Sequence, residues 1–294
     1  MKYTRMICLL LSMLFLLPGC SEAPDCQIAA TTLPVYQFTV RLCEGTGITV
    51  TRLVTASISC LHDYSLSVSQ VKALEAAELT VISGAGLEES IEEALSKSRH
   101  IIDASAEVPI VPCEEDGHEH EADAHGHHHE QDAHIWLAPH NAMIMARNIC
   151  RGLCDYAPEH REVFETNLAL LLEDLAALEA YGTAQLSDLR CRELMTFHDG
   201  FGHFARAFDL HIVSAIEEES GSEASAQELK DMISCVREHQ LPALFTERSG
   251  SVSAADIIAA ETGAGVYALD MAIAGQDYFS AMYHNIDTIK EALG

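Results

Sequence analysis

Residues 158–187 read PEHREVFETNLALLLEDLAALEAYGTAQLS, one uninterrupted helical pattern near the middle of the chain. The apolar residues of this stretch recur at spacings of four and three: Phe164, Leu168, Leu171, Leu175 and Leu178. A helix places such residues on a single stripe, and thirty residues of helix extend about 45 Å. A coiled-coil dimer is an alternative use of the stripe, but the repeat lasts only about two heptads. We therefore predict one long rigid helix, residues 156–188, that joins two halves of the chain.

Strand-like and helix-like segments alternate on both sides of this helix. The candidate strands before it are residues 26–31, 48–54, 79–83 and 99–103, and those after it are residues 193–197, 211–215, 242–246 and 265–269. Such alternation implies parallel sheets with crossover helices. The predicted fold class is α/β with two lobes, each a four-stranded, mostly parallel sheet flanked by helices. Residues 20–155 form the first lobe and residues 189–294 the second.

The composition narrows the class of protein further. Of the 294 residues, 48% are hydrophobic and 21% are charged, which argues against disorder and against a polytopic membrane protein. The chain carries 17 Lys and Arg against 45 Asp and Glu, a net charge of -28. This balance predicts no nucleic-acid partner, because binding to phosphates needs a basic surface. A negative field suits cationic ligands, or solubility alone.

The first twenty residues have the pattern of a targeting segment. Lys2 and Arg5 precede an apolar run over residues 6–17, which is too short to cross a bilayer comfortably as a helix. Pro18-Gly19-Cys20 then resembles a bacterial lipobox. We predict that residues 1–19 are a signal peptide and that Cys20 is lipidated, so that the protein is extracytoplasmic and lipid-anchored to the bacterial membrane. The alternative is an ordinary signal peptide with a cysteine nearby.

A histidine-rich, low-complexity segment covers residues 117–131. Its imidazoles belong to His118, His120, His125, His127, His128 and His129. Such a segment cannot build a core, so it is predicted to be a mobile loop that binds metal ions weakly. A tight site needs ligands held by folded elements instead.

Four side chains outside the loop have the positions expected of metal ligands. His62 and His198 lie just beyond predicted strands, and Asp270 follows the last one. His134 lies where the loop re-enters the fold. Ligands of α/β lobes bind at the carboxyl ends of strands, so two ligands from each lobe would meet in one cleft as a tetrahedral set suited to zinc. Taken alone, each histidine also fits an ordinary surface or core position.

Several motifs follow one another in a fixed order along the chain. They are His62-Asp63-Tyr64, Gly84-Ala85-Gly86-Leu87-Glu88, the histidine-rich loop, Asp132-Ala133-His134-Ile135-Trp136-Leu137-Ala138-Pro139 and Phe197-His198-Asp199-Gly200-Phe201-Gly202. Together they resemble the zinc- and manganese-binding lipoproteins of cluster A-I, which deliver metal to ABC importers. The resemblance implies that the metal lies in the cleft between two lobes joined by a stiff helix, and that contact with the importer's permease releases it. We expect the protein to be a monomer.

The resemblance assigns roles to individual residues. His62, His134 and His198 match the three histidine ligands, and Asp270 matches the carboxylate that completes the site in many members. Glu247 matches a carboxylate that supports the ligands rather than binding the metal.

Two departures from the family's pattern affect the fourth ligand. Leu61 stands where some zinc-binding members carry a glutamate, and Met271 stands where a proline usually follows the aspartate. The fourth ligand is therefore Asp270 or a water molecule. Three imidazoles with at most one carboxylate favour Zn²⁺ over Mn²⁺, which prefers more oxygen ligands.

The sequence also bears on other classes of function. An extracellular zinc hydrolase would suit three histidines and an open position, but the chain has neither a His-Glu-x-x-His motif nor a Gly-x-Ser-x-Gly elbow. A manganese-type lipoprotein and a metal-dependent adhesin remain alternatives. The sequence thus predicts a zinc-binding transport protein and no enzyme.

Overall fold

The computed structural model describes residues 27–55, 61, 64–110, 132–215, 225–248, 250, 252–275 and 277–294. Several predicted features lie outside these residues: the signal peptide at 1–19, Cys20, His62, and the six histidines of the loop at 117–131. Four of the predicted features can be located in the structure, namely the sheets, the long helix, the pair His134 and His198, and the carboxylates of Glu247 and Asp270.

The first lobe is built on a four-stranded parallel sheet with strand order β2-β1-β3-β4. Its strands are β1 (Ile28–Ala30), β2 (Val50–Arg52), β3 (Leu79–Ile82) and β4 (Ile101–Asp103). Its crossovers contain α2 (Leu33–Leu42), α3 (Val68–Ala76), and the short helices η1 (Glu89–Ile91) and α4 (Glu92–Leu95). A capping box between Ser67 and Gln70 begins α3.

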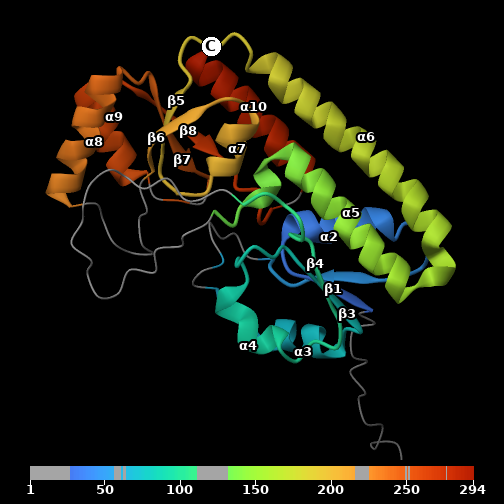
Figure 1. The fold of residues 1–294 in the computed structure, drawn as a ribbon. Coiled ribbons are helices and arrows are strands. Elements are labelled where there is room, and N and C mark those ends of the chain that lie inside the picture. The colour runs from blue at the N-terminus through green and yellow to red at the C-terminus, as the bar shows by residue number, and fades with distance from the viewer. Residues whose placement is uncertain are drawn as a thin grey trace, which may run out of the picture.

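The second lobe repeats this arrangement with strand order β6-β5-β7-β8, again parallel. Its strands are β5 (Glu193–Thr196), β6 (His211–Ala215), β7 (Ala243–Glu247) and β8 (Gly265–Leu269). The helices are α7 (Gly202–Ala207), α8 (Ala226–His239), α9 (Ser253–Thr262) and α10 (Tyr278–Leu293). The two sheets lie at opposite ends of the molecule (Figure 1), and the predicted fold class is confirmed.

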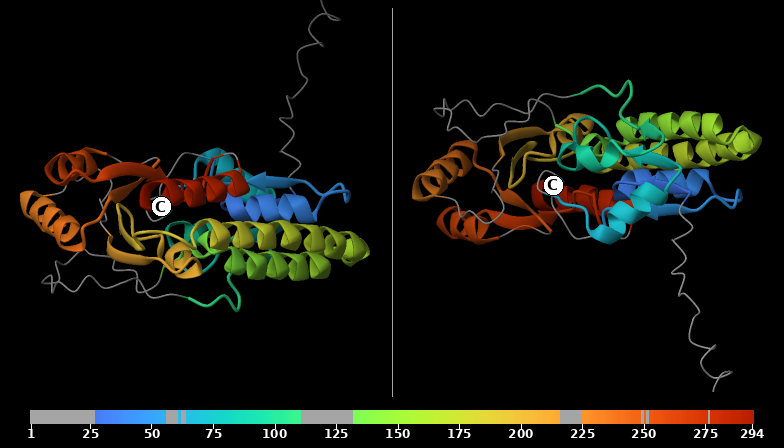
Figure 2. Two further views of the ribbon diagram at one scale, coloured as in Figure 1. Left: turned by 90° about the horizontal axis from the view of Figure 1, so that it is seen from above. Right: turned by 90° about the horizontal axis from the view of Figure 1, so that it is seen from below.

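Two antiparallel helices run along the outside of the lobes (Figures 1 and 2). The chain leaves the first lobe through η2 (Ile135–Leu137) and α5 (Pro139–Tyr156), turns at η3 (Pro158–His160), and returns along α6 (Arg161–Gln185). Four of the five predicted stripe residues are fully buried in the core, and Leu168 is partly buried against it. The helix is shorter than predicted. Pro158 disfavours helical geometry at Ala157, which has φ -132° and ψ 72°, residues 158–160 form the 3₁₀ turn η3, and α6 ends at Gln185.

A buried carboxylate explains the Gly84-to-Glu88 motif. Glu88 accepts hydrogen bonds from Thr31 Oγ1 (2.7 Å), Ser83 N (2.8 Å) and Gly84 N (3.0 Å), and burial raises its pKa to about 7. Gly84 has φ +79°, and a Cβ there would collide with the Asp103 carboxylate. The motif therefore ties the ends of β1 and β3 together.

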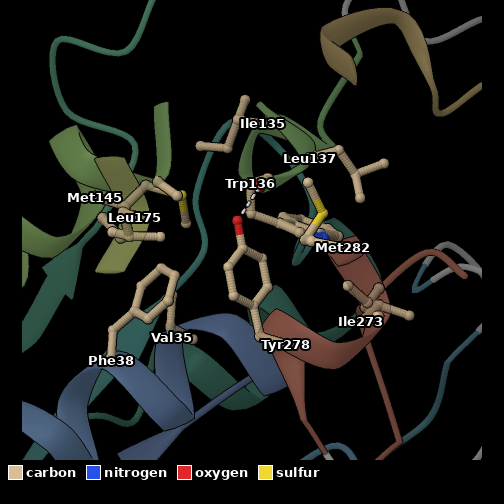
Figure 3. Packing of buried hydrophobic residues seen from close by; sticks show 14 of the residues in the cluster. Val35, Phe38, Ile135, Trp136, Leu137, Met145, Leu175, Ile273, Tyr278 and Met282 are labelled. Atoms are coloured by element: carbon tan, nitrogen blue, oxygen red, sulfur yellow. Dashed lines mark hydrogen bonds between the residues drawn. The ribbon is translucent and has the colours of Figure 1, made fainter. Parts of the chain in front are cut away.

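One hydrophobic core extends across both lobes (Figure 3). The Trp136 indole of the first lobe donates to Met271 O at 2.8 Å, and Tyr278 Oη of α10 donates back to Trp136 O at 2.8 Å. The Tyr278 ring also contacts Phe38 of α2 edge-on, with centroids 5.1 Å apart. The lobes are thus held by packing in addition to their helical connection.

We expect zinc binding to change the overall shape very little, because this shared core would have to separate for the lobes to hinge. Small-angle scattering of the apo and zinc-bound protein should give the same radius of gyration within error. A shrinkage of the size seen in hinge-closing sugar-binding proteins would contradict this expectation.

Candidate metal centre

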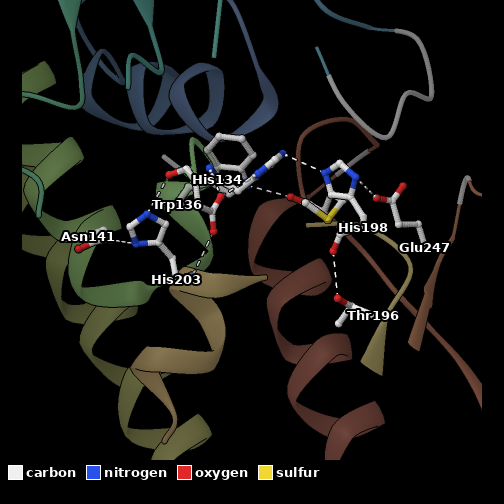
Figure 4. Close-up of polar contacts among 9 residues, drawn as sticks. His134, Trp136, Asn141, Thr196, His198, His203 and Glu247 are labelled. Carbon is white, nitrogen blue, oxygen red and sulfur yellow. Dashed lines mark hydrogen bonds and ion pairs between the residues drawn. The ribbon is translucent and has the colours of Figure 1, made fainter. Parts of the chain in front are cut away.

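Two imidazoles from different lobes face each other between the sheets (Figure 4). His134 immediately precedes η2, and His198 follows the end of β5 by two residues. Their Nε2 atoms are 3.4 Å apart, and their rings meet edge-on with centroids 5.0 Å apart. His134 is buried, and the His198 side chain is only 12% exposed.

A carboxylate orients the first imidazole. Asp132 Oδ1 accepts from the backbone N–H of His134 at 2.8 Å and lies 2.9 Å from its Nδ1. An ionised carboxylate only accepts hydrogen bonds, so Nδ1 carries the proton and the lone pair of Nε2 faces His198. Burial alone would raise the pKa of Asp132, but the hydrogen bond from His134 and the nearby imidazoles of His134 and His203 outweigh it and lower that pKa.

The second imidazole has a matching partner. Glu247 ends β7, and its Oε1 lies 3.2 Å from His198 Nδ1, with both side chains largely buried. Thr196 Oγ1 also donates to His198 O at 3.0 Å, which holds the backbone at the strand end. Metal-binding histidines usually direct their second ring nitrogen to such a carboxylate. The geometry therefore directs the Nε2 atoms of the two facing rings toward each other.

The spacing of the two Nε2 atoms has a chemical meaning. Tetrahedral zinc holds imidazole nitrogens at about 2.0–2.1 Å, which puts two such ligands about 3.3–3.4 Å apart. The observed 3.4 Å matches one edge of that tetrahedron. Gly200 permits this approach, because a Cβ there would lie 2.6 Å from His198 Cδ2 and 2.7 Å from His134 Nδ1.

Asp270 is not brought together with the histidine pair in the same way. Its Oδ2 lies 3.4 Å from Arg248 Nη1, and its Oδ1 accepts from Ala272 N at 2.8 Å. Asn285 holds the backbone of Asp270 on both sides, as donor and as acceptor, at 2.7 Å. Among the described residues no three His, Cys, Asp or Glu side chains form a group that could hold a metal ion. Asp270 and His62 therefore stay predictions as ligands.

Three further polar residues lie near His134, and no role in metal binding is predicted for them from the sequence. Asp132 is the carboxylate just described, His203 on α7 contacts it, and Asn141 on α5 contacts His203. The Asp-x-His spacing is a signal that could have identified Asp132. Burial lowers the pKa of His203. Its partners lie about 60 to 70 residues away in sequence, so no local pattern indicates them.

Comparison with known proteins gives concordant matches. The family model described as zinc-uptake complex component A, periplasmic (ZnuA), matches residues 28–292. The zinc-binding protein AdcA of Streptococcus pyogenes is 28% identical over 296 residues, which cover 90% of this chain and 55% of AdcA, so the chain spans about half of that relative's length.

Solved structures agree with this assignment. A crystal structure of ZnuA is 30% identical, with a TM-score of 0.78, over 92% of this chain and 100% of that one. A zinc-bound deletion mutant of ZnuA is 29% identical, with a TM-score of 0.76, over 92% of this chain and 99% of that one.

Proposed function

The chain belongs to the family of periplasmic zinc-uptake components, whose model covers residues 28–292, and from this premise we propose that it captures Zn²⁺ outside the cytoplasm and passes the ion to the permease of an ABC importer. The family is one of transport components rather than enzymes. The observation that carries the proposal is the pair of Nε2 atoms, 3.4 Å apart, on His134 and His198. The protein acts as a monomer with zinc as its cargo.

His62 is proposed as the third ligand and Asp270 as the fourth, with water as the alternative to Asp270. Imidazole binds metal through a neutral nitrogen, and Asp132 and Glu247 lie against the Nδ1 atoms of the two imidazoles, so that the two Nε2 atoms face the proposed position of the ion. For Asp270 to reach the ion, its carboxylate must leave Arg248, which now lies 3.4 Å away. A nitrogen-rich set of this kind favours Zn²⁺ over Mn²⁺, and a zinc-bound relative supports the same choice.

The experiment that tests the function uses the soluble chain that starts after Cys20. Metal analysis and chelator competition should find one tightly bound zinc ion per protein and much weaker binding of Mn²⁺. Absence of a tight zinc ion would refute zinc capture. A permease and an ABC ATPase encoded beside this gene would support delivery to an importer over adhesion or hydrolysis.

Lipidation of Cys20 is proposed to hold the protein at the membrane. In the part of the chain that the structure describes, no helix has the length and apolar character needed to span a bilayer. We expect Cys20→Ser to move the protein from the membrane fraction to the soluble fraction, because the anchoring thiol is removed. Fractionation followed by immunoblotting measures this. Recovery of the wild-type protein in the soluble fraction would contradict lipid anchoring at Cys20.

The histidine-rich loop is proposed to supply additional weak sites. Fixing residues around an ion costs about 1–2 kcal/mol for each residue, so sites on a segment whose sequence predicts mobility should be far weaker than a preorganised site. We expect deletion of residues 117–131 to leave one tight zinc ion and to remove the weak ones, as measured by calorimetry. Loss of the tight ion from a deletion variant with a native circular dichroism spectrum would show that the loop supplies a main ligand.

A further inference from the structure

We infer that His203 is a positioning residue for the metal site, which fixes the first-lobe ligand His134 from the second lobe by way of Asp132. This inference rests on the proposed function. His203 lies on α7, is almost fully buried, and touches Asp132 rather than either facing imidazole nitrogen.

The contacts hold Asp132 on two sides. The backbone N–H of His203 lies 3.3 Å from Asp132 Oδ2, and the ring Nε2 lies 3.0 Å from Asp132 O. The other carboxylate oxygen, Oδ1, accepts from His134. Asp132 therefore lies between His134, which it orients, and His203 of the opposite lobe.

A single tautomer satisfies all of these groups. Asn141 Nδ2 donates to His203 Nδ1 at 3.1 Å, so Nδ1 acts as the acceptor and Nε2 carries the proton. Nε2–H can then donate to the carbonyl of Asp132. The donors and acceptors of these contacts match, so the residues from Asn141 to His134 form a buried hydrogen-bond network, and such networks favour one geometry.

His203 lies close in the sequence to His198, the second facing imidazole. His198 and His203 lie on the same short segment after β5, so the segment that carries one facing imidazole also contacts the residue that orients the other. The backbone N–H of His203 faces the Asp132 carboxylate, and its ring bonds to the Asp132 carbonyl. Gly202 allows the approach, because a Cβ there would lie 2.9 Å from Asp132 Oδ2. The separation of the two Nε2 atoms is thus set locally, within a few residues of the site. Preorganisation of this kind raises affinity, since less freedom is lost on binding.

His203→Phe tests the inference, because phenylalanine keeps an aromatic ring and the backbone N–H, but its ring cannot donate to the Asp132 carbonyl. We expect zinc affinity to fall about 10-fold, the lower end of the range for residues that orient metal ligands. The visible absorption bands of bound Co²⁺ should shift, which reports a changed ligand geometry. His203→Gln, which retains a donor, should recover part of the affinity.

Gln37→Leu is the matched control. Gln37 of α2 bonds to Asp277 (3.3 Å) and Tyr278 N (2.7 Å), so it also joins the lobes through polar contacts, but not through His134. We expect its zinc affinity and Co²⁺ spectrum to match wild type. Equal losses in His203→Phe and Gln37→Leu would overturn the inference, because they would indicate general loosening of the lobes.

A double-mutant cycle tests the route through Asp132. In an Asp132→Asn background, His203→Phe should cause little further loss, because the group that it positions has already been altered. Fully additive losses of zinc affinity would refute an effect of His203 that passes through Asp132 to His134. So would wild-type affinity in His203→Phe. If that variant does not fold, Asn141→Leu applies the same test from the other end of the network. These outcomes are distinct from failure of the proposed function, in which wild type itself binds no tight zinc.

Discussion

Replacement of His198 by alanine is expected to weaken zinc binding by at least about 100-fold, more than the 10- to 100-fold typical of a residue that only orients a ligand. His198 supplies one of two facing Nε2 atoms at the spacing of a zinc tetrahedron. Its loss would also leave the Glu247 carboxylate without its imidazole partner in a largely buried position. His134→Ala should have an effect of the same size. Competition against a chromophoric chelator at neutral pH measures both.

His140→Ala is the matched control for these variants. His140 lies at the start of α5, six residues after His134, and its side chain is exposed. We expect this variant to bind one zinc ion with wild-type affinity. If His198→Ala or His134→Ala did the same, with a native circular dichroism spectrum, the facing pair would not be the zinc site.

The sheets could be predicted from sequence because their signal is local. Within each lobe a helical segment separates every strand from the next, and parallel pairing requires such crossovers. All eight predicted strands overlap observed ones. The end of a helix depends on finer details: Ala157 before Pro158 is not helical, and a 3₁₀ turn over residues 158–160 precedes the start of α6 at Arg161.

The sequence predicts the positions of the ligands only in part. His134 and His198 were predicted from their motifs, and the structure brings their Nε2 atoms within 3.4 Å. The sequence also predicts Asp270 as a ligand, but its carboxylate faces Arg248 in the structure. Ion pairs of this kind depend on side-chain rotamers, which a motif does not specify.

The contacts between the lobes could not be predicted at all. Trp136 and Met271 are 135 residues apart in sequence, and Tyr278 and Trp136 are 142 apart. An apolar pattern indicates that a residue is buried, but it does not identify the residue against which it packs. Only the structure therefore shows how the two lobes pack against each other, and this packing leads to a further prediction.

We expect Trp136→Ala to lower the free energy of unfolding of the metal-free protein by about 3–5 kcal/mol, the range for truncation of a large buried aromatic side chain. Trp136 is fully buried at the junction of the lobes, and its indole N–H bonds to Met271 O. Without it, that carbonyl loses its donor and a cavity opens in the shared core. His134 would also lose an edge-on ring contact, whose centroid distance is 5.4 Å.

Urea titration followed by circular dichroism, with a chelator present, measures this loss. Because the core is continuous between the lobes, wild type and variant should each unfold in one transition, with the variant's midpoint lower. Leu170→Ala, at a position 54% exposed on α6, is the control and should change the free energy by less than about 0.5 kcal/mol. A loss below about 1 kcal/mol in Trp136→Ala, or two separate transitions in wild type, would show that the lobes are stabilised independently and that the junction contributes little to the fold.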